Sequence, residues 1–240
     1  LGSALYLLQT WRAAREHGFL RARPSRATLR NILRISLPNG VQQFFFATGL
    51  TVLFWIIGRV GADEVAVAHI LITLILFLIL PAIGLGLSAA SLVGQALGRR
   101  DADDAYRWGW DVTRLAVSLL FVLALPMWLV PDLILGLFLK QPALVELGRA
   151  PLMITGLAIC LDGVAIIFTQ ALLGAGAARS VMVVTLAVQW FFFLPLAYII
   201  GPVLGYGLLG IWLAQAFQRL ITSLLLSGLW IKRGWAHIEL

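Results

Sequence analysis

Six long apolar stretches, separated by short polar loops, constrain this chain more than any other feature. Each is longer than about 20 residues, the length at which an α-helix crosses the roughly 30 Å hydrocarbon core of a bilayer. Of the 240 residues, 61% are hydrophobic and only 12% are charged, which is about half the charged fraction of a typical soluble domain. Too few charges remain to cover a soluble surface. The sequence therefore predicts an all-α integral membrane protein and excludes a soluble enzyme, a nucleic-acid-binding domain and a disordered chain.

The apolar stretches predict a bundle of six transmembrane helices. We expect these helices at residues 37–58, 65–97, 108–130, 149–173, 180–200 and 208–231. The second is too long for one straight crossing, and Pro81 with Gly84 and Gly86 near its middle predicts a bend. At its end we expect Gly98 to cap this helix and Asp101 to cap the next one.

The segments that flank the six helices are expected to lie outside the bundle. Residues 1–11 look like the last turns of an earlier membrane helix, residues 12–36 form a basic linker with seven Arg, and residues 232–240 form a tail. Within the linker, Ser25 could cap an amphipathic helix that lies on anionic headgroups, and a solvated linker is the alternative. Because Leu1 is not an initiator Met, we interpret the chain as part of a longer protein.

Basic residues are unevenly distributed between the two sides of the predicted membrane. If the linker is cytoplasmic, that side carries thirteen Lys and Arg residues, and the opposite side carries three. Cytoplasmic loops of membrane proteins are enriched in Lys and Arg. We therefore expect a multi-pass protein of the cell membrane with both ends of this chain in the cytoplasm. The formal net charge of +7 follows from this topology and does not indicate a nucleic-acid partner.

One carboxylate lies deep within a predicted span. Asp162 is near the middle of the fourth helix, where a charge costs roughly 2.5–3.5 kcal/mol on insertion scales. It must be protonated, bound to a cation or paired with another helix. We predict a site that couples transport to a proton or sodium ion, and the alternative is a neutral acid that hydrogen-bonds to a neighbouring helix. Arg219, near the middle of the last helix, is a candidate countercharge, unless its long side chain reaches the membrane surface.

Neutral polar side chains within the spans are candidates for the wall of a substrate cavity. With Arg219, the candidates are Asn39, Gln42, Gln43, His69, Thr73, Gln170, Gln189 and Gln215. The alternative is that such side chains simply hold helices together, which for His69 is the more common situation. The sequence contains no Ser–His–Asp arrangement, no pair of deep carboxylates, no metal-ligand cluster and no nucleotide-binding loop. We therefore expect neither an enzyme nor a bound cofactor.

Several strings in the chain resemble the multidrug and toxic compound extrusion (MATE) family. They are LPNGVQQFFF, GRVGADEVAVAH and above all LPAIGLGLSAASLVGQALGRRDADDAYR, with LGAGAARSVM and GLLGIWLAQ extending the similarity over residues 30–235. The resemblance implies a twelve-helix transporter built from two six-helix lobes that are joined by a cytoplasmic linker. This chain would be the carboxy-terminal lobe with that linker, and its partner would be the missing amino-terminal half.

The resemblance also implies a role for Asp162, which matches an acidic residue of the tenth helix that contributes to the cation site in many members. Two other residues of that site differ here, since Phe46 occupies the position of a seventh-helix carboxylate and Ala158 that of a tyrosine. The paired-acid site is thus incomplete, unless the main ion site lies in the missing half. Within this half, the partners expected for Asp162 are Gln43, His69 and Arg219.

Together these features predict an antiporter that exports amphipathic or cationic organic compounds in exchange for sodium ions or protons, by alternating access. Either ion suits one aspartate with neutral neighbours. A flippase for lipid-linked or polysaccharide precursors is the second candidate, although we would expect it to carry more cationic residues along its cavity than Arg114 and Arg219. A membrane scaffold without transport activity is a third, less favoured candidate.

Overall fold

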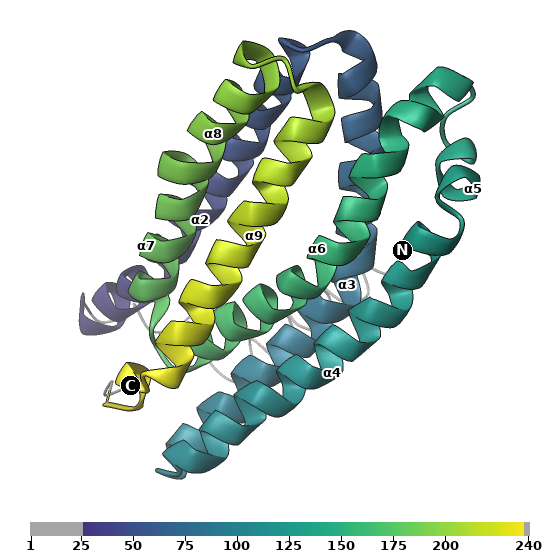
Figure 1. Cartoon of the computed structure of the whole chain (residues 1–240). Helices are drawn as coiled ribbons and strands as arrows, with labels where there is room; N and C mark the ends of the chain where they lie inside the picture. The colour runs from purple at the N-terminus through teal and green to yellow at the C-terminus, as the bar shows by residue number, and fades with distance from the viewer. Residues whose placement is uncertain (1–25, 238–240) are drawn as a thin grey trace, which may run out of the picture. The chain divides into compact units, whose positions relative to one another are not determined.

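The computed structural model describes the backbone of residues 26–237 and, from Gly40 onward, the side chains (Figure 1). The predictions for residues 1–11, for residues 12–25 of the linker and for the last three residues of the tail lie outside the described residues. The chain divides into two units, residues 1–40 and residues 41–240. The described part of the first unit is the beginning of helix α2, and the second unit contains the helical bundle.

Every regular element among the described residues is a helix. After α2 (Arg26–Gly58), these are α3 (Ala62–Gly98), α4 (Ala102–Leu129), α5 (Pro131–Gly136), α6 (Pro142–Gly174), α7 (Ala178–Ala187), η1 (Val188–Phe193), α8 (Leu194–Tyr198), η2 (Ile199–Val203), α9 (Gly207–Ile231) and η3 (Gly234–His237). Six stretches within them are long and apolar enough to cross a bilayer. The prediction of six membrane-spanning helices is thus confirmed.

Several helices extend beyond the apolar stretches that predicted them. Helix α2 runs without a break from Arg26–Gly58, although we expected the first span to start at residue 37. Pro38 removes only one backbone hydrogen bond, and the helix continues through it. Helices α4 and α6 begin at Ala102 and Pro142, several residues before their predicted starts at residues 108 and 149. Caps and prolines at the first helical positions determine where these helices begin, whereas hydropathy marks only the part that suits hydrocarbon.

Helix α3 is the long helix for which we predicted a bend. It has 37 residues with Pro81 inside, and its direction changes near the middle (Figure 1). At its end the prediction for Gly98 was wrong, because Gly98 is the last helical residue and Arg100 has the left-handed conformation, with φ 61°. The prediction for Asp101 is confirmed, since its side chain accepts a hydrogen bond from the Asp104 N–H at 2.9 Å.

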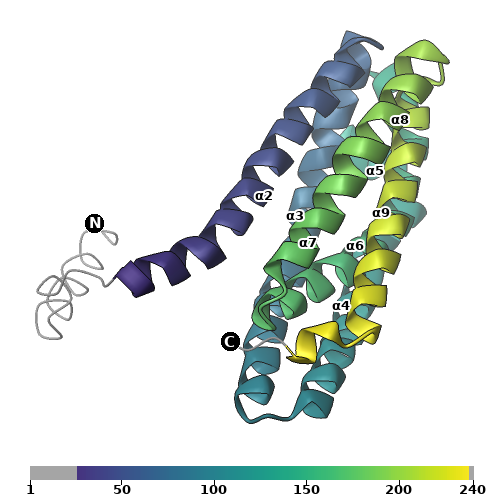
Figure 2. The ribbon, with the colours of Figure 1, turned by 90° about the vertical axis from the view of Figure 1, so that its left-hand side faces the viewer.

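The fifth span is continuous but is not a regular α-helix. Helices α7 and α8 alternate with two π-helical segments, η1 and η2. The π-helical segment η2 contains Pro202, and a π-helical turn accommodates a residue that has no N–H to donate. Figure 2 shows this span running alongside α9, which it contacts over most of its length. Segment η1 carries Gln189, one of the candidate cavity residues.

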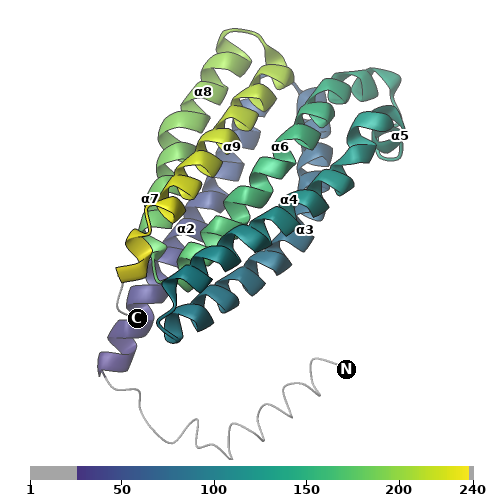
Figure 3. The ribbon, with the colours of Figure 1, turned by 60° about the horizontal axis from the view of Figure 1, so that its bottom comes forward.

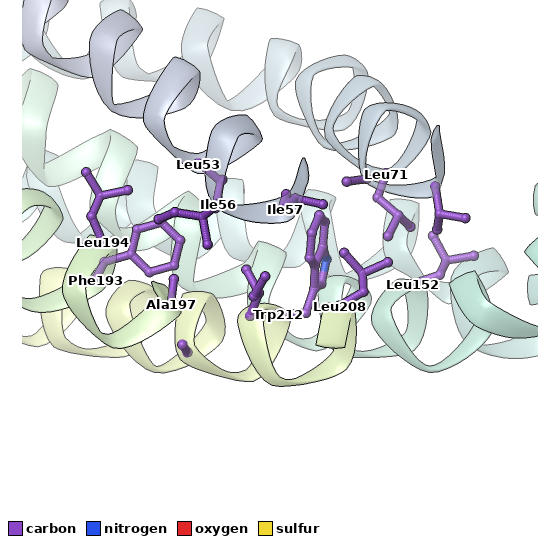
Figure 4. Packing of buried hydrophobic residues seen from close by; sticks show 14 of the residues in the cluster. Leu53, Ile56, Ile57, Leu71, Leu152, Phe193, Leu194, Ala197, Leu208 and Trp212 are labelled. Atoms are coloured by element: carbon purple, nitrogen blue, oxygen red, sulfur yellow. The ribbon is translucent and has the colours of Figure 1, made fainter. Parts of the chain in front are cut away.

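Helix α6 is central to the bundle, because it packs against α3 and α4 on one side and against α9 on another (Figure 3). The largest cluster of buried residues includes Ile57 of α2, Leu71 of α3, Leu152 of α6 and Trp212 of α9. Figure 4 shows the indole of Trp212 lying between Ile57 and Leu208. With Met127 of α4 and Phe193 of the fifth span, this cluster includes buried residues of all six spans.

A second cluster joins the opposite ends of the helices. Trp235 of η3 is buried and stacks on Trp230 of α9, with ring centroids 4.2 Å apart. Close to these rings in the sequence, Arg233 forms an ion pair at 2.5 Å with Asp103 of α4. The predicted tail therefore begins with an ordered turn that packs on the bundle, because stacking of two indole rings buries a large apolar area.

Candidate functional site

The candidate site is an ion pair between α6 and α9. The Arg219 guanidinium donates a hydrogen bond through Nη1 to Oδ2 of Asp162 at 2.5 Å. The two side chains are only 10% and 19% exposed, respectively. The sequence suggested Arg219 as the countercharge of Asp162, and the structure places the two in direct contact. Among the side chains that the structure describes, Arg219 is the hydrogen-bond partner of Asp162, rather than Gln43 or His69.

A second polar contact fixes the alignment of the same two helices. The Trp212 indole N–H donates to the hydroxyl of Thr155 at 2.9 Å, and both side chains are buried. Thr155 precedes Asp162 by seven residues, and Trp212 precedes Arg219 by seven. Seven residues are close to two turns of an α-helix, so both contacts lie on the same faces of α6 and α9. Since α6 and α9 run parallel to each other, a second contact between the same two faces is expected seven residues after the first, and the ion pair lies there.

A glycine next to Asp162 brings a further helix close to the site. A Cβ atom on Gly163 would lie 2.8 Å from Cδ1 of Leu120 on α4. The Leu120 side chain of α4 therefore occupies the space that a side chain at residue 163 would take, directly beside Asp162.

Asp162 and Arg219 are the charged side chains that lie deep within the spans that the structure describes. Within residues 41–58, 70–98, 115–129, 150–178, 180–203 and 208–231, Asp162 and Arg219 are the only charged side chains, whereas the first half of α4 carries Asp111 and Arg114. A charge in this environment is costly unless it is paired. Asp162 and Arg219 satisfy each other, and the interior of this half is neutral as a result.

Two of the neutral candidates contact a neighbouring helix at a glycine. A Cβ atom on Gly86 of α3 would lie 2.8 Å from Cγ of Gln170, which therefore packs directly on the α3 backbone. Gln189 occupies the space beside Gly49 in the same way, with Nε2 at 2.0 Å from such an atom. Both glutamines are half-buried. Such contacts are what the alternative stated from the sequence predicts, namely that polar groups hold helices together.

The remaining candidates are spread over three helices. Gln43, His69 and Thr73 are exposed, and the hydroxyl of Thr73 donates to the His69 carbonyl oxygen at 2.8 Å. Gln42 and Gln215 are half-buried, and Gln215 is one turn before Arg219 on α9. The side chain of Asn39 lies outside the described part of the chain. Of all the candidates, the structure brings together Asp162 and Arg219, with Gln215 on the same face of α9.

Sequence reasoning missed Thr155 and Trp212. Threonine and tryptophan are common in membrane helices, and neither carries a charge that would single it out. The available signal was their spacing of seven residues from Asp162 and Arg219, respectively. That signal becomes informative only when α6 and α9 are known to be neighbours in parallel register. Within the residues that the structure describes, no group of three or more His, Cys, Asp or Glu side chains could hold a metal ion.

Comparison with known sequences places the chain among membrane transporters. The profile of the MatE family matches residues 38–199. A protein of Thermotoga maritima named "Probable multidrug resistance protein NorM" is 28% identical over 221 residues, which are 88% of this chain and 47% of that protein. A protein of the same name from Pseudomonas aeruginosa is 29% identical over 204 residues, 82% of this chain and 42% of that protein. The chain spans about half the length of the curated relatives it matches.

Solved structures show the same fold. A crystal structure of MATE in complex with MaL6 superposes with a TM-score of 0.81 at 19% identity, covering 89% of this chain and 49% of that one. A multidrug resistance MATE family transporter of the MOP superfamily matches in its outward-facing conformation with a TM-score of 0.79 and in its inward-facing conformation with a TM-score of 0.75, each at 19% identity. In both conformations the match covers 88% of this chain and about half of that protein.

Proposed function

We propose, because this chain belongs to the MatE family, that it forms the carboxy-terminal half of a multidrug efflux transporter in the cell membrane. The NorM relatives described above are about twice as long as the region they share with this chain. A second six-helix lobe, on the amino-terminal side, would supply that missing length. The six described spans would then be one wall of a substrate pathway between two lobes, with the ends of this chain in the cytoplasm.

The observation that carries the proposal is the Asp162–Arg219 pair in the middle of two adjacent membrane helices. Ionisable residues within membrane helices are costly, and they mark ion pathways and proton relays in pumps and transporters. A carboxylate at this depth binds a proton or a sodium ion more readily than any neutral candidate in the described spans. We therefore propose that export of amphipathic organic compounds is coupled to the entry of sodium ions or protons through Asp162.

The fold is compatible with transport by alternating access. The described lobe resembles the corresponding region of one transporter in both its outward-facing and inward-facing conformations. A lobe that keeps its fold in both states can rock as a body against its partner, which is how alternating access operates around a fixed site. Under this proposal, small organic molecules bind between the lobes, and the bilayer surrounds both of them.

The flippase alternative is less well supported by the charges in this half. Its substrates are anionic, and their recognition calls for cationic side chains with no acidic partner. Arg219 is paired with Asp162, and Arg114 is paired with Asp111 at 3.2 Å. The deep cationic residue, Arg219, therefore already has a buried acidic partner, and drug efflux is the function that we favour.

Efflux from cells tests the proposed function against the flippase. The full-length protein should be produced in a bacterial host that lacks its own major exporters, and the accumulation of ethidium should be followed by fluorescence. We expect accumulation to fall several-fold and to recover when the sodium and proton gradients are collapsed. Host cells that carry the empty vector are the control. Translocation of a lipid-linked precursor without any change in ethidium accumulation would favour the flippase and reject drug efflux.

A further inference from the structure

We propose that Arg219 is a resident counterion of the coupling site. Its guanidinium holds Asp162 while no external cation is bound, and a sodium ion or proton that binds Asp162 must displace it. The inference rests on the proposed function, because it describes how the same carboxylate is occupied between transport cycles. It assigns Arg219 a specific role, which is to set the affinity of Asp162 for the external cation by competing with it.

The geometry of the pair allows such an exchange. One hydrogen bond joins Arg219 and Asp162, from Nη1 to Oδ2, and the second carboxylate oxygen is not used by the guanidinium. A bidentate arginine–carboxylate pair would be held more firmly. Asp162 is also the more exposed partner, at 19% against 10% for Arg219. An incoming cation can therefore reach the carboxylate before the guanidinium has left it.

The two cations exclude each other for electrostatic reasons. A carboxylate that held a sodium ion and a guanidinium together would leave one uncompensated positive charge in a low-dielectric interior, which is costly. Helices α3, α4 and α9 pack around α6. Besides Asp162, α6 carries Cys160 and α9 carries Arg219, while α4 carries Asp111 and Arg114, which pair with each other and are 60% and 76% exposed. None of these groups supplies an unpaired negative charge to Asp162. Occupancy by the external cation therefore requires Arg219 to leave.

Gln215 offers a partner for the released guanidinium. It lies four residues before Arg219 on α9 and is half-buried. Residues at this spacing share a helical face, and an amide oxygen can accept a hydrogen bond from a guanidinium group. The side chain of Arg219 can thus turn from Asp162 toward Gln215 and keep a hydrogen bond, while its charge moves away from the bound cation.

Exchange at Asp162 leaves α6 and α9 in contact. The Thr155–Trp212 hydrogen bond anchors the two helices on one side of the ion pair. On the other side, Phe168 packs against Trp230, with ring centroids 5.8 Å apart. The movement is therefore confined to the side chain of Arg219. A variant that lacks the guanidinium should keep the packing of these helices for the same reason.

The experiment measures how strongly the driving cation binds when Arg219 is replaced. The full-length protein is reconstituted in liposomes, and ethidium transport is driven by an imposed sodium gradient at equal pH or by a proton gradient without sodium. For Arg219→Gln we expect the half-saturating concentration of the driving cation to fall about tenfold, since a charge-assisted hydrogen bond no longer competes. The maximal rate should fall as well, because a tightly held cation leaves slowly. Arg219→Lys keeps a competing positive charge, so its half-saturating cation concentration should be closer to that of the parent protein.

A purely structural role for Arg219 predicts a different result. The maximal rate of Arg219→Gln would then fall while the half-saturating cation concentration stayed the same or rose, and this would overturn the inference. If neither gradient drives transport by the parent, the proposed function itself fails. Competition between Arg219 and a cation for Asp162 is then tested by thermal unfolding. Sodium chloride should raise the unfolding temperature above that measured in choline chloride at equal ionic strength. This increase should occur at lower sodium concentrations for Arg219→Gln than for the parent. Equal protection of both proteins would reject competition by Arg219.

Discussion

Replacement of Asp162 by Asn in the full-length protein is expected to abolish cation-driven efflux. Asparagine has the same shape but cannot carry the negative charge that binds a cation. It also leaves Arg219 buried without a counterion, and removal of one partner from a buried pair costs about 3–5 kcal/mol. Ethidium efflux should therefore fall to the level of vector-only cells, and thermal unfolding of the purified protein should occur at a lower temperature.

Asp111→Asn is the matched control for this prediction. It makes the same chemical change and also breaks an ion pair, but Asp111 and Arg114 are 60% and 76% exposed. An exposed pair contributes only about 0–1 kcal/mol, so both efflux and stability should stay close to those of the parent. The double variant Asp162→Asn/Arg219→Gln removes both buried charges and should regain much of the lost stability. Efflux should not return with it, and efflux by Asp162→Asn alone would place the coupling carboxylate outside this half.

Replacement of Gly174 by Ala is expected to cause a large loss of stability. A Cβ atom at this position would lie 2.4 Å from the carbonyl oxygen of Ala90 on α3 and 2.8 Å from its Cα atom. Because both contacts are with backbone atoms, a side-chain rotation cannot relieve them, and α3 and α6 must move apart. Overpacking of this kind costs about 1–3 kcal/mol, and we expect a value near the upper end. Thermal unfolding of the purified protein measures the effect.

Gly228→Ala makes the identical change where there is room for it. A Cβ atom on Gly228 would have no atom of another group within 4 Å. Alanine in the interior of α9 should even stabilise the helix, by up to about 1 kcal/mol. The two substitutions should therefore shift the unfolding temperature in opposite directions. If Gly174→Ala unfolds at the same temperature as the parent, α3 and α6 do not approach as closely as the structure shows.

The fold could be predicted from the sequence wherever hydropathy determines it. The six membrane-spanning helices follow from uninterrupted apolar runs, and the bend in α3 follows from Pro81. Hydropathy placed the starts of α4 and α6 too late, because α4 has a polar first turn capped by Asp101 and α6 begins at Pro142, ahead of Glu146 and Arg149. Hydropathy reports which residues suit hydrocarbon, whereas helices continue until their backbone hydrogen bonds are capped.

The candidate site was only partly predictable for a similar reason. Asp162 stands out in the sequence because a lone charge in a span requires a partner, and Arg219 is the deep cation that can provide it. The contacts of Gln170 and Gln189 could not be predicted, since each depends on a glycine of a different helix, Gly86 or Gly49. The sequence shows which residues are charged, but it does not show which helix each side chain packs against.

Exchange of a cation for substrate can be observed when the fluxes of both are measured at the same time. Liposomes that contain the full-length protein are prepared with the same sodium concentration and the same pH inside and outside. Ethidium is then added to the outside. We expect ethidium uptake to drive an outward flux of sodium ions or protons, and we expect Asp162→Asn to abolish both fluxes together. Ethidium uptake with no movement of either cation, or cation flux that is the same without ethidium, would contradict such an exchange.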